Sequence, residues 1–308
     1  MAVDNMDDPK IYRIDAFTTE PGQGNRAGVV TDASGLDEAG MQAIAHALGH
    51  SETAFVLPPP GDDHDLYLRF FTPSHEVPVC GHATVAAHYA LALEGAPPGI
   101  RRQLTGAGVQ IVETLRDGDD TVVRIAQSPP EFAPPLAPDL VRQVLAALGV
   151  ETGDLDFRCP LQVVSTGHGK LMIGLERHAR LRALQPDLAR LAALSPQVGS
   201  NGYFVFTLDT ADDDDAGSHG RMFAPAIGID EDPVTGNANG PLGAYLVRYG
   251  LLAARDGEAR FRARQRAGDG RHGHVDVTVR VDGGAPVAVT IEGRAVLGQR
   301  YAPIGTLS

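Results

Sequence analysis

The sequence predicts an α+β fold of two similar halves, in which each half wraps a curved sheet around one central helix. Three observations lead to it: strand-like segments outnumber helix-like ones, the chain matches itself in two places, and a Pro-rich stretch, "SPPEFAPPLAPD", separates the two copies like a linker. We expect halves at 1–128 and 129–308, with a last strand, about 291–298, that could cross back to the first half. The active site is expected in the cleft between them.

The self-match is the observation that indicates a duplication. "PVCGHATVAAHYAL" (78–91) aligns without gaps with "PVTGNANGPLGAYL" (233–246). Upstream, "RFFTP" resembles "RMFAP", and "SETAFVL" resembles "SNGYFVF". One such match could arise by chance, but three in the same order indicate two structurally similar halves.

Each half offers its elements in a similar order. In the first half we expect a strand "KIYRIDAF", a Gly-containing turn "PGQGNRAGVV", a helix "DEAGMQAIAHALG", strands "ETAFVLP" and "LYLRFFTP", a helix from His82 to about Leu93, and strands "QLTGAGVQIVETL" and "TVVRIAQ". In the second half we expect the apolar segment "LQVVSTGHGKLMIGL", a helix near "PDLARLAAL", strands "GYFVFTLD" and "GRMFAPAI", a helix after Gly236, and strands "EARFRARQ", "HVDVTVRV" and "VAVTIEG". The acidic run "ADDDDAGSHG" (211–220) is expected to be a solvated loop.

Composition narrows the class of function. The chain has 308 residues, 43% of them hydrophobic, and a net charge of −13, which would repel a nucleic-acid backbone. The acidic opening "MAVDNMDDPKIYRIDAF" does not resemble an export signal, and no apolar run could span a bilayer. We therefore expect a cytoplasmic protein with no nucleic-acid or membrane partner. Cys80 and Cys159 are too few for a disulfide framework, and reduced thiols are expected.

Two glycine turns are candidate anion sites. Gly81-His82 and Gly236-Asn237 each stand at the start of an expected helix, where unpaired backbone N–H groups and the helix dipole favour negative charge. A carboxylate-bearing small molecule is the expected ligand. The alternative is that each glycine serves only the tight turn from strand to helix.

Four side chains near these turns are candidates for chemistry. Glu52 precedes an apolar strand, so its carboxylate is expected to be partly desolvated, as a general base requires, unless it is a solvated turn or capping residue. His82 is a core histidine, a helix cap or a catalytic group. Cys80 is a small buried hydrophobe or a nucleophile, and Asp232 is a turn former or a second acid.

The motifs "GNRAGVV", "SETAFV", "FTPSHEVPVCGHAT" and "EDPVTGNA" resemble the PhzF-like family of phenazine biosynthesis, from about Tyr12 to about Gly298. The resemblance implies the duplicated diaminopimelate epimerase fold and an isomerase with no cofactor and no metal. A homodimer is possible. In the phenazine enzyme the glutamate of "SET" moves a proton within a dihydro-hydroxyanthranilate, and the histidine of "GH" and the aspartate of "DP" hold or assist the substrate. The matching residues are Glu52, His82 and Asp232.

The same resemblance bears on Cys80. Diaminopimelate epimerases and proline racemases use two thiols, one at each helix start, but Thr235 stands where the second thiol would be and Cys159 lies outside the match. A two-thiol racemase is therefore disfavoured. A racemase assisted by Cys80 alone and a non-catalytic binding protein remain as alternatives.

Two departures from the family pattern concern the second turn. Asn237 stands where a small hydroxyl residue is expected, and "NGPLG" is expected to place Asn-Gly-Pro in the first turn of the helix, where a proline is tolerated. Both departures point away from the phenazine precursor as substrate.

Overall fold

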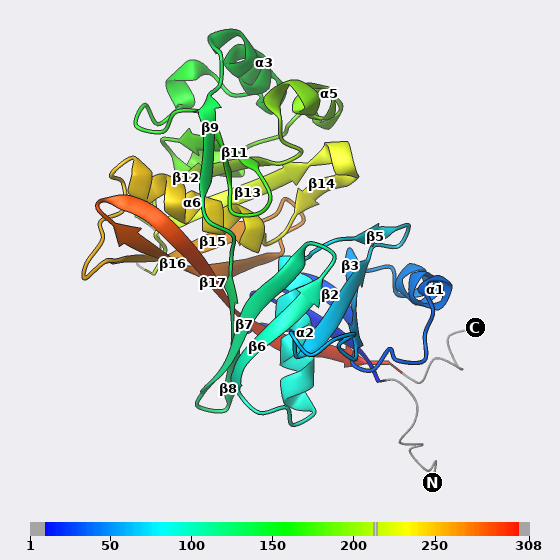
Figure 1. Ribbon diagram of the computed structural model, residues 1–308. Helices are drawn as coiled ribbons and strands as arrows, with labels where there is room; N and C mark the ends of the chain where they lie inside the picture. The colour runs from blue at the N-terminus through cyan, green and yellow to red at the C-terminus, as the bar shows by residue number, and fades with distance from the viewer. Residues whose placement is uncertain (1–9, 212, 214, 302–308) are drawn as a thin grey trace. The chain divides into compact units, whose positions relative to one another are not determined.

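The computed structural model describes residues 10–211, 213 and 215–301, and the acidic opening residues 1–9 lie outside them (Figure 1). The chain forms two compact units. Unit 1 holds the described residues up to Ile125 and from Gly293 onward, and unit 2 is Ala126–Glu292. Strands dominate both units.

Unit 1 is built on strands that occur close together along the chain. They are β1 Ile11–Ala16, β2 Asn25–Val30, β3 Glu52–Leu57, β4 Leu66–Phe71, β5 Glu76–Val77, β6 Gly99–Thr105, β7 Gly108–Asp117, β8 Asp120–Ala126 and the end of β17 Ala285–Arg300. β3 pairs in parallel with β2 and antiparallel with β4, and β4 pairs in parallel with β6. The parallel pairing of β2 and β3 sets Ala27 opposite Glu52.

Local sequence signals define α1, Glu38–Leu48. The Asp37 carboxylate accepts a hydrogen bond from the Gly40 N–H, and the helix ends at Gly49, which has φ of 63°. Met41, Ile44 and Ala45 are buried on the face that contacts β3 and β4. The predicted helix at 37–49 is therefore confirmed.

The helix α2, Gly81–Leu93, is buried on nearly every side and contacts β1, β2 and β3. Small residues such as Ala83, Ala86 and Ala90 let these strands approach closely, and they favour the helical conformation. The strands thus pack around α2.

Unit 2 contains β9 Glu131–Pro135, β10 Gln162–Ser165, β11 Lys170–Leu175, β12 Tyr203–Thr207, β13 Ser218–Ala224, β14 Ile229–Asp232, β15 Glu258–Arg266, β16 His272–Asp282 and the beginning of β17. β12 pairs in parallel with β11 and antiparallel with β13, and β13 pairs in parallel with β15. The helix α6, Gly236–Arg248, contacts β10, β11, β15 and β16.

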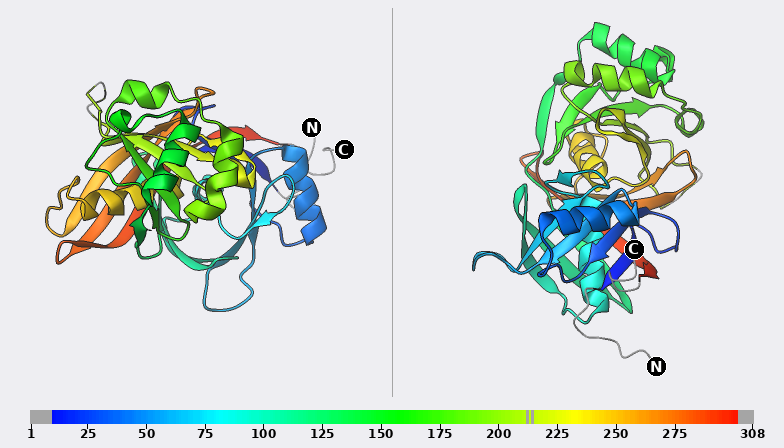
Figure 2. Two further views of the ribbon diagram at one scale, coloured as in Figure 1. Left: turned by 90° about the horizontal axis from the view of Figure 1, so that it is seen from above. Right: turned by 90° about the vertical axis from the view of Figure 1, so that its right-hand side faces the viewer.

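The Pro-rich stretch was predicted to be a linker. This prediction is wrong, because β9 and the start of α3 lie in the stretch. Phe132 faces Val164 across the antiparallel pair of β9 and β10. The helix α3, Pro138–Leu148, begins with proline at a position where the missing N–H costs nothing. It packs beside α5, Leu188–Val198 (Figure 2). The short α4, His178–Arg182, precedes α5 along the chain.

Three further expectations need correction. The predicted turn at 21–30 ends at Gly24, since Gly22 and Gly24 have positive φ and the next residues form β2. The single strand predicted at 103–115 is a hairpin of β6 and β7 around Gly106-Ala107. In the acidic run, Asp212 and Asp214 lie outside the described residues, Asp213 pairs with Arg264, and the last three residues belong to β13.

No helix among the described residues has both the length and the apolar character needed to cross a membrane.

Candidate active site

Glu52 is the first residue of β3, and only 9% of it is exposed. The carboxylate atom Oε2 is buried and has no hydrogen-bond partner among the described residues. The alternative of a solvated turn residue is therefore wrong. A buried carboxylate oxygen without a hydrogen bond is costly, and such groups in native proteins call for a functional explanation.

Cys80 and His82 lie at the start of α2. Cys80 is the N-cap and makes no side-chain capping bond, so the first N–H groups of the helix, including those of Gly81 and His82, have no partner within the helix. His82 is the second helical residue and is buried, which corrects the alternative that it is itself the cap.

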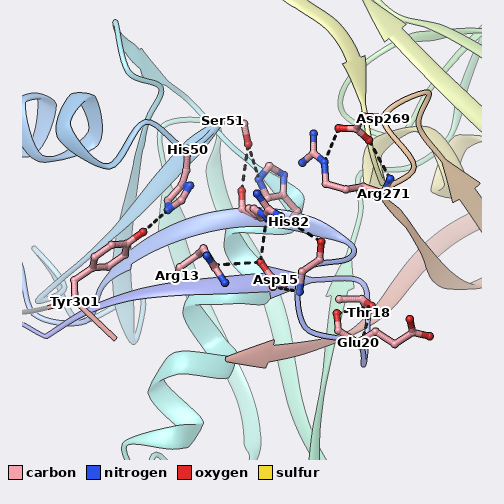
Figure 3. Close-up of polar contacts among 12 residues, drawn as sticks. Arg13, Asp15, Thr18, Glu20, His50, Ser51, His82, Asp269, Arg271 and Tyr301 are labelled. Atoms are coloured by element: carbon pink, nitrogen blue, oxygen red, sulfur yellow. Dashed lines mark hydrogen bonds and ion pairs between the residues drawn. The ribbon is translucent and has the colours of Figure 1, made fainter. Parts of the chain in front are cut away.

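The His82 imidazole lies between three side chains of unit 1. Its Nδ1 is 3.3 Å from Cys80 Sγ, and its Nε2 is 3.3 Å from both Ser51 Oγ and Glu52 Oε2. Figure 3 shows Ser51 and His82 pointing toward one another. Nδ1 therefore faces one neighbour, and Nε2 faces two.

The hydrogen bonds of Ser51 favour one tautomer of His82. The Ser51 hydroxyl has one proton, and with that proton on the Arg26 carbonyl at 3.3 Å it can only accept from His82. In that tautomer Nε2 carries the hydrogen, and the lone pair of Nδ1 faces the Cys80 thiol.

Ligand atoms of Glu52, Cys80 and His82 lie close enough together to hold a metal ion. The same three groups can also pass a proton, because Sγ adjoins Nδ1 and the carboxylate adjoins Nε2.

A charged group of unit 1 that sequence reasoning missed adjoins these residues. Asp15 is fully buried and accepts a hydrogen bond from the Gly22 N–H, while Arg13 and Arg26 approach its Oδ1 at 3.7 and 3.8 Å (Figure 3). Burial lowers the pKa of nearby His50, and the positive charges of Arg13 and Arg26 lower it further. His50 therefore binds a proton less readily than an ordinary histidine.

In unit 2, Asp232 ends β14 just before α6. Its Oδ2 accepts a hydrogen bond of 2.5 Å from the Thr235 hydroxyl, which is the turn arrangement expected of an aspartate before proline. Gln265, only 2% exposed, accepts from the Thr235 N–H and from Asn239, and donates to the Asp232 carbonyl. The residues around Asp232 are thus held by a connected network.

Thr235 is the N-cap of α6 and makes no side-chain capping bond, so Gly236 and Asn237 present N–H groups without helical partners. The Asn237 side chain accepts a hydrogen bond from Gln127. Pro241 lies in the second turn, not the first as predicted, and having no N–H it cannot donate to the Asn237 carbonyl. Gly236 and Asn237 therefore have the backbone features of an anion site.

Cys159 is a core residue of unit 2. It is buried in unit 2 against Phe206 and Tyr245, and burial raises the pKa of its thiol to about 12. Neither cysteine forms a disulfide. Cys159 thus remains a protonated core residue, as its place outside the sequence match suggested.

A family model described as phenazine biosynthesis-like protein (PhzC-PhzF) matches residues 14–300. The chain belongs to this family. The PhzF-like chain is 47% identical to an uncharacterized isomerase of Clostridium acetobutylicum, over 93% of this chain and 95% of that one. It is 33% identical to the trans-2,3-dihydro-3-hydroxyanthranilate isomerase of Pseudomonas aeruginosa, over 77% and 79% of the two chains.

Solved structures agree with this assignment. A PhzF-family phenazine biosynthesis protein of Bacillus anthracis gives a TM-score of 0.86 at 30% identity, covering 96% of this chain and 99% of that one. A probable proline racemase of Agrobacterium radiobacter gives 0.63 at 15% identity, covering 96% and 92%, which shows a shared fold alone. The predicted family is confirmed, and the two relatives from C. acetobutylicum and P. aeruginosa are both named isomerases.

Proposed function

We propose that this protein is an isomerase that moves a proton within a small carboxylate-bearing metabolite, with Glu52 as general acid and base. The observation that carries the proposal is the buried Oε2 of Glu52, which has no hydrogen-bond partner and lies 3.3 Å from His82 Nε2. A carboxylate oxygen in this state is ready to accept a proton from a ligand. Positioned proton transfer of this kind contributes about 10²–10⁴-fold to rate.

The proton balance of the step needs only this chain and the ligand. Glu52 Oε2 takes a proton from a carbon next to an activating group, and the electron pair of the broken C–H bond delocalises into the ligand. The Nε2–H of His82 stabilises the negative charge that develops. Glu52 then returns the proton to a different carbon, so that the carboxylate is regenerated and the product is an isomer.

We propose that backbone N–H groups at the two glycine turns bind ligand carboxylate, and that Asp232 accepts a hydrogen bond from the ligand. The absence of side-chain caps at Cys80 and Thr235 supports this role, because the N–H groups that follow each cap are left for an external acceptor. The use of one ligand by residues of both units stays a prediction.

We propose further that the two units are duplicated halves, each with a central helix. The order of strand pairing within each unit supports this. The series β2, β3, β4, β6 in unit 1 pairs parallel, antiparallel, parallel, and so does the series β11, β12, β13, β15 in unit 2. In each unit one largely buried helix, α2 or α6, lies along the chain between the third and the fourth strand of the series.

Deuterium uptake tests the proposed function without knowledge of the product. The protein is incubated in heavy water with a panel of small carboxylates that includes trans-2,3-dihydro-3-hydroxyanthranilate, the compound in the name of the P. aeruginosa relative. We expect one class of compound to gain deuterium with the wild type and not with Glu52→Gln. Equal uptake with both proteins would refute the role of Glu52.

A racemase that uses Cys80 is the second candidate, favoured by the 3.3 Å approach of Cys80 Sγ to His82 Nδ1. Proton transfer from the thiol to the ring would give a thiolate that could take the α-proton of an amino acid. Deuterium at the α-carbon of a free amino acid, lost in Cys80→Ala, would identify this activity.

A further inference from the structure

Lysine is rare in this chain. Of its 26 basic residues other than histidine, only Lys10 and Lys170 are lysines and the others are arginines. Lys10 is on the surface, with 63% of its side chain exposed, whereas Lys170 begins β11 inside unit 2 and is partly buried. An amine can bind a ligand as a compact cation or lose its proton when enclosed, whereas a guanidinium stays charged.

The packing of Lys170 directs its side chain along the sheet. A side chain at Gly202 would overlap the Lys170 stem and the end of Met222, so the glycine leaves the space that the stem occupies. Met222 in turn faces Asp232 across the pairing of β13 and β14. The stem of Lys170 thus runs over Gly202 toward the strand that ends at Asp232.

The ammonium group has unused bonding capacity. Its one hydrogen bond among the described residues goes to the Gly169 carbonyl at 3.3 Å, and within that part of the chain it forms no ion pair. An ammonium has three donors. Burial lowers the pKa of Lys170 to about 8, and the negative charge of Asp232 works in the opposite direction.

Two titratable groups interact with Lys170. Burial lowers the pKa of His168, and the charge of Lys170 lowers it further, so His168 is neutral near pH 7. The Asp232 carboxylate is already bound by the Thr235 hydroxyl at 2.5 Å. An enclosed cation with unmet donors, near a negative group that has its own partner, is suited to an external anion.

We propose that Lys170 is a specificity residue that binds an anionic group, a carboxylate, of the ligand in unit 2. The proposal rests on the proposed function, and it adds a side-chain cation to the backbone N–H groups of Gly236 and Asn237. The ligand class becomes a metabolite whose carboxylate is recognised by charge as well as by hydrogen bonds. Neutral amides of the same shape gain nothing from this charge.

Selective labelling of lysine provides a direct readout. Protein labelled with ¹³C at lysine Cε gives only two signals, because the chain has two lysines. We expect the Lys170 signal to titrate at about pH 8 in the ligand-free protein. Addition of anthranilate or of glutarate is expected to shift this signal and to raise its pKa toward the ordinary value of about 10.4. The Lys10 signal is the internal control and stays unchanged.

Affinity measurements give the matched comparison. Anthranilate and 2-aminobenzamide share a shape but differ in charge. Lys170→Met, which keeps the stem and removes the charge, is expected to weaken anthranilate binding at least about tenfold while 2-aminobenzamide is unaffected. Lys10→Met changes neither. Because the free amine loses its proton near pH 8, wild-type affinity for anthranilate falls about tenfold from about pH 7 to about pH 9.

Gly202→Ala tests the geometry with the charge retained. The added methyl would displace the Lys170 stem, so anthranilate binding is expected to weaken although the lysine is present. Unchanged circular dichroism and an unchanged Lys10 signal would show that the variant folds.

The outcomes separate this proposal from the proposed function, since none of these readouts requires turnover. A Lys170 signal that does not respond to either carboxylate, or equal anthranilate affinity in the wild type and Lys170→Met, overturns the role of Lys170 and leaves Glu52 chemistry standing. A carboxylate response of Lys170 in a protein that never incorporates deuterium supports Lys170 and counts against the isomerase.

Discussion

The starts of α2 and α6 have similar backbones and different chemistry. Each helix begins at a glycine after a cap residue that makes no side-chain capping bond. At α2 the neighbouring polar groups leave a buried Glu52 oxygen without a hydrogen bond. At α6, Gln265 binds the Thr235 N–H and the Asp232 carbonyl, and Thr235 binds the Asp232 carboxylate.

This difference indicates a division of roles. An unsatisfied carboxylate raises the energy of the folded protein and is available to react, whereas a connected network fixes positions and lowers the energy. We interpret the α2 start as the place of proton transfer and the α6 start as a place of binding. Mutations at the two helix starts should therefore affect different properties.

The largest expected loss of stability is at Gln265. Gln265→Leu removes the acceptor of the Thr235 N–H and of the Asn239 amide, and it should lower the free energy of unfolding by roughly 4 kcal/mol. Gln103 is a buried glutamine of unit 1 that serves for comparison, and it meets His88 at 2.8 Å and both Thr84 and Gln110 at 3.4 Å. Gln103→Leu should cost about 2 kcal/mol, because one of its three bonds is short and the other two are long.

Urea unfolding of the two variants checks this order. A larger loss for Gln103→Leu than for Gln265→Leu would show that the α6 start is not the more tightly bonded of the two.

Part of the acid sensitivity of the fold should come from α2. Burial lowers the pKa of His88 to about 4, and its bond to Gln103 only partly offsets this. The unfolded chain binds the proton at about pH 6.5, so the contribution of neutral His88 is complete above that pH and is lost as the pH falls toward 4. The loss amounts to about 3 kcal/mol at pH 4. Gly243 stands at the matching position of α6 and cannot titrate.

Unfolding free energies of wild type and His88→Gln between about pH 7 and about pH 4 measure this effect. The variant should lose much less stability over that range. Parallel pH profiles of the two proteins would rule out His88 as the cause.

A smaller effect is expected at Thr235. Thr235→Val removes the hydroxyl that donates to Asp232 Oδ2 and should cost about 1.5 kcal/mol, whereas Thr235→Ser keeps the hydroxyl and should cost less. Thermal unfolding of the pair isolates the hydrogen bond from the loss of the methyl group. Equal destabilisation by both substitutions would mean that the hydroxyl contributes little.

Local signals in the sequence predicted many elements. Asp37 and Gly49 mark the two ends of α1, and both act as caps in the structure. The errors arose where glycine and proline were given too much weight as residues that end a helix or strand. Glycines before Asn25 hid β2, and prolines hid β9 and the start of α3, because a proline at the first helical position or on a short strand interrupts little.

The sequence could predict those residues of the candidate site that lie within its motifs. The proximity of Glu52, Cys80 and His82 in unit 1 agrees with their selection from the sequence. Ser51 lies in the same motif, yet its influence on the tautomer of His82 depends on the Arg26 carbonyl of another strand. Lys170 was missed because its environment depends on Gly202 and Met222, which no local pattern connects to it.

The central claim is that Glu52, and not Cys80, moves the proton, and comparing Glu52→Gln with Cys80→Ala tests it most directly. The measurement is the rate of deuterium incorporation into whichever carboxylate the wild type labels. Glu52→Gln should slow incorporation by at least about 10²-fold while ligand binding is kept, and Cys80→Ala should retain most of the rate. An inactive Cys80→Ala beside an active Glu52→Gln would contradict the account and assign the chemistry to the thiol.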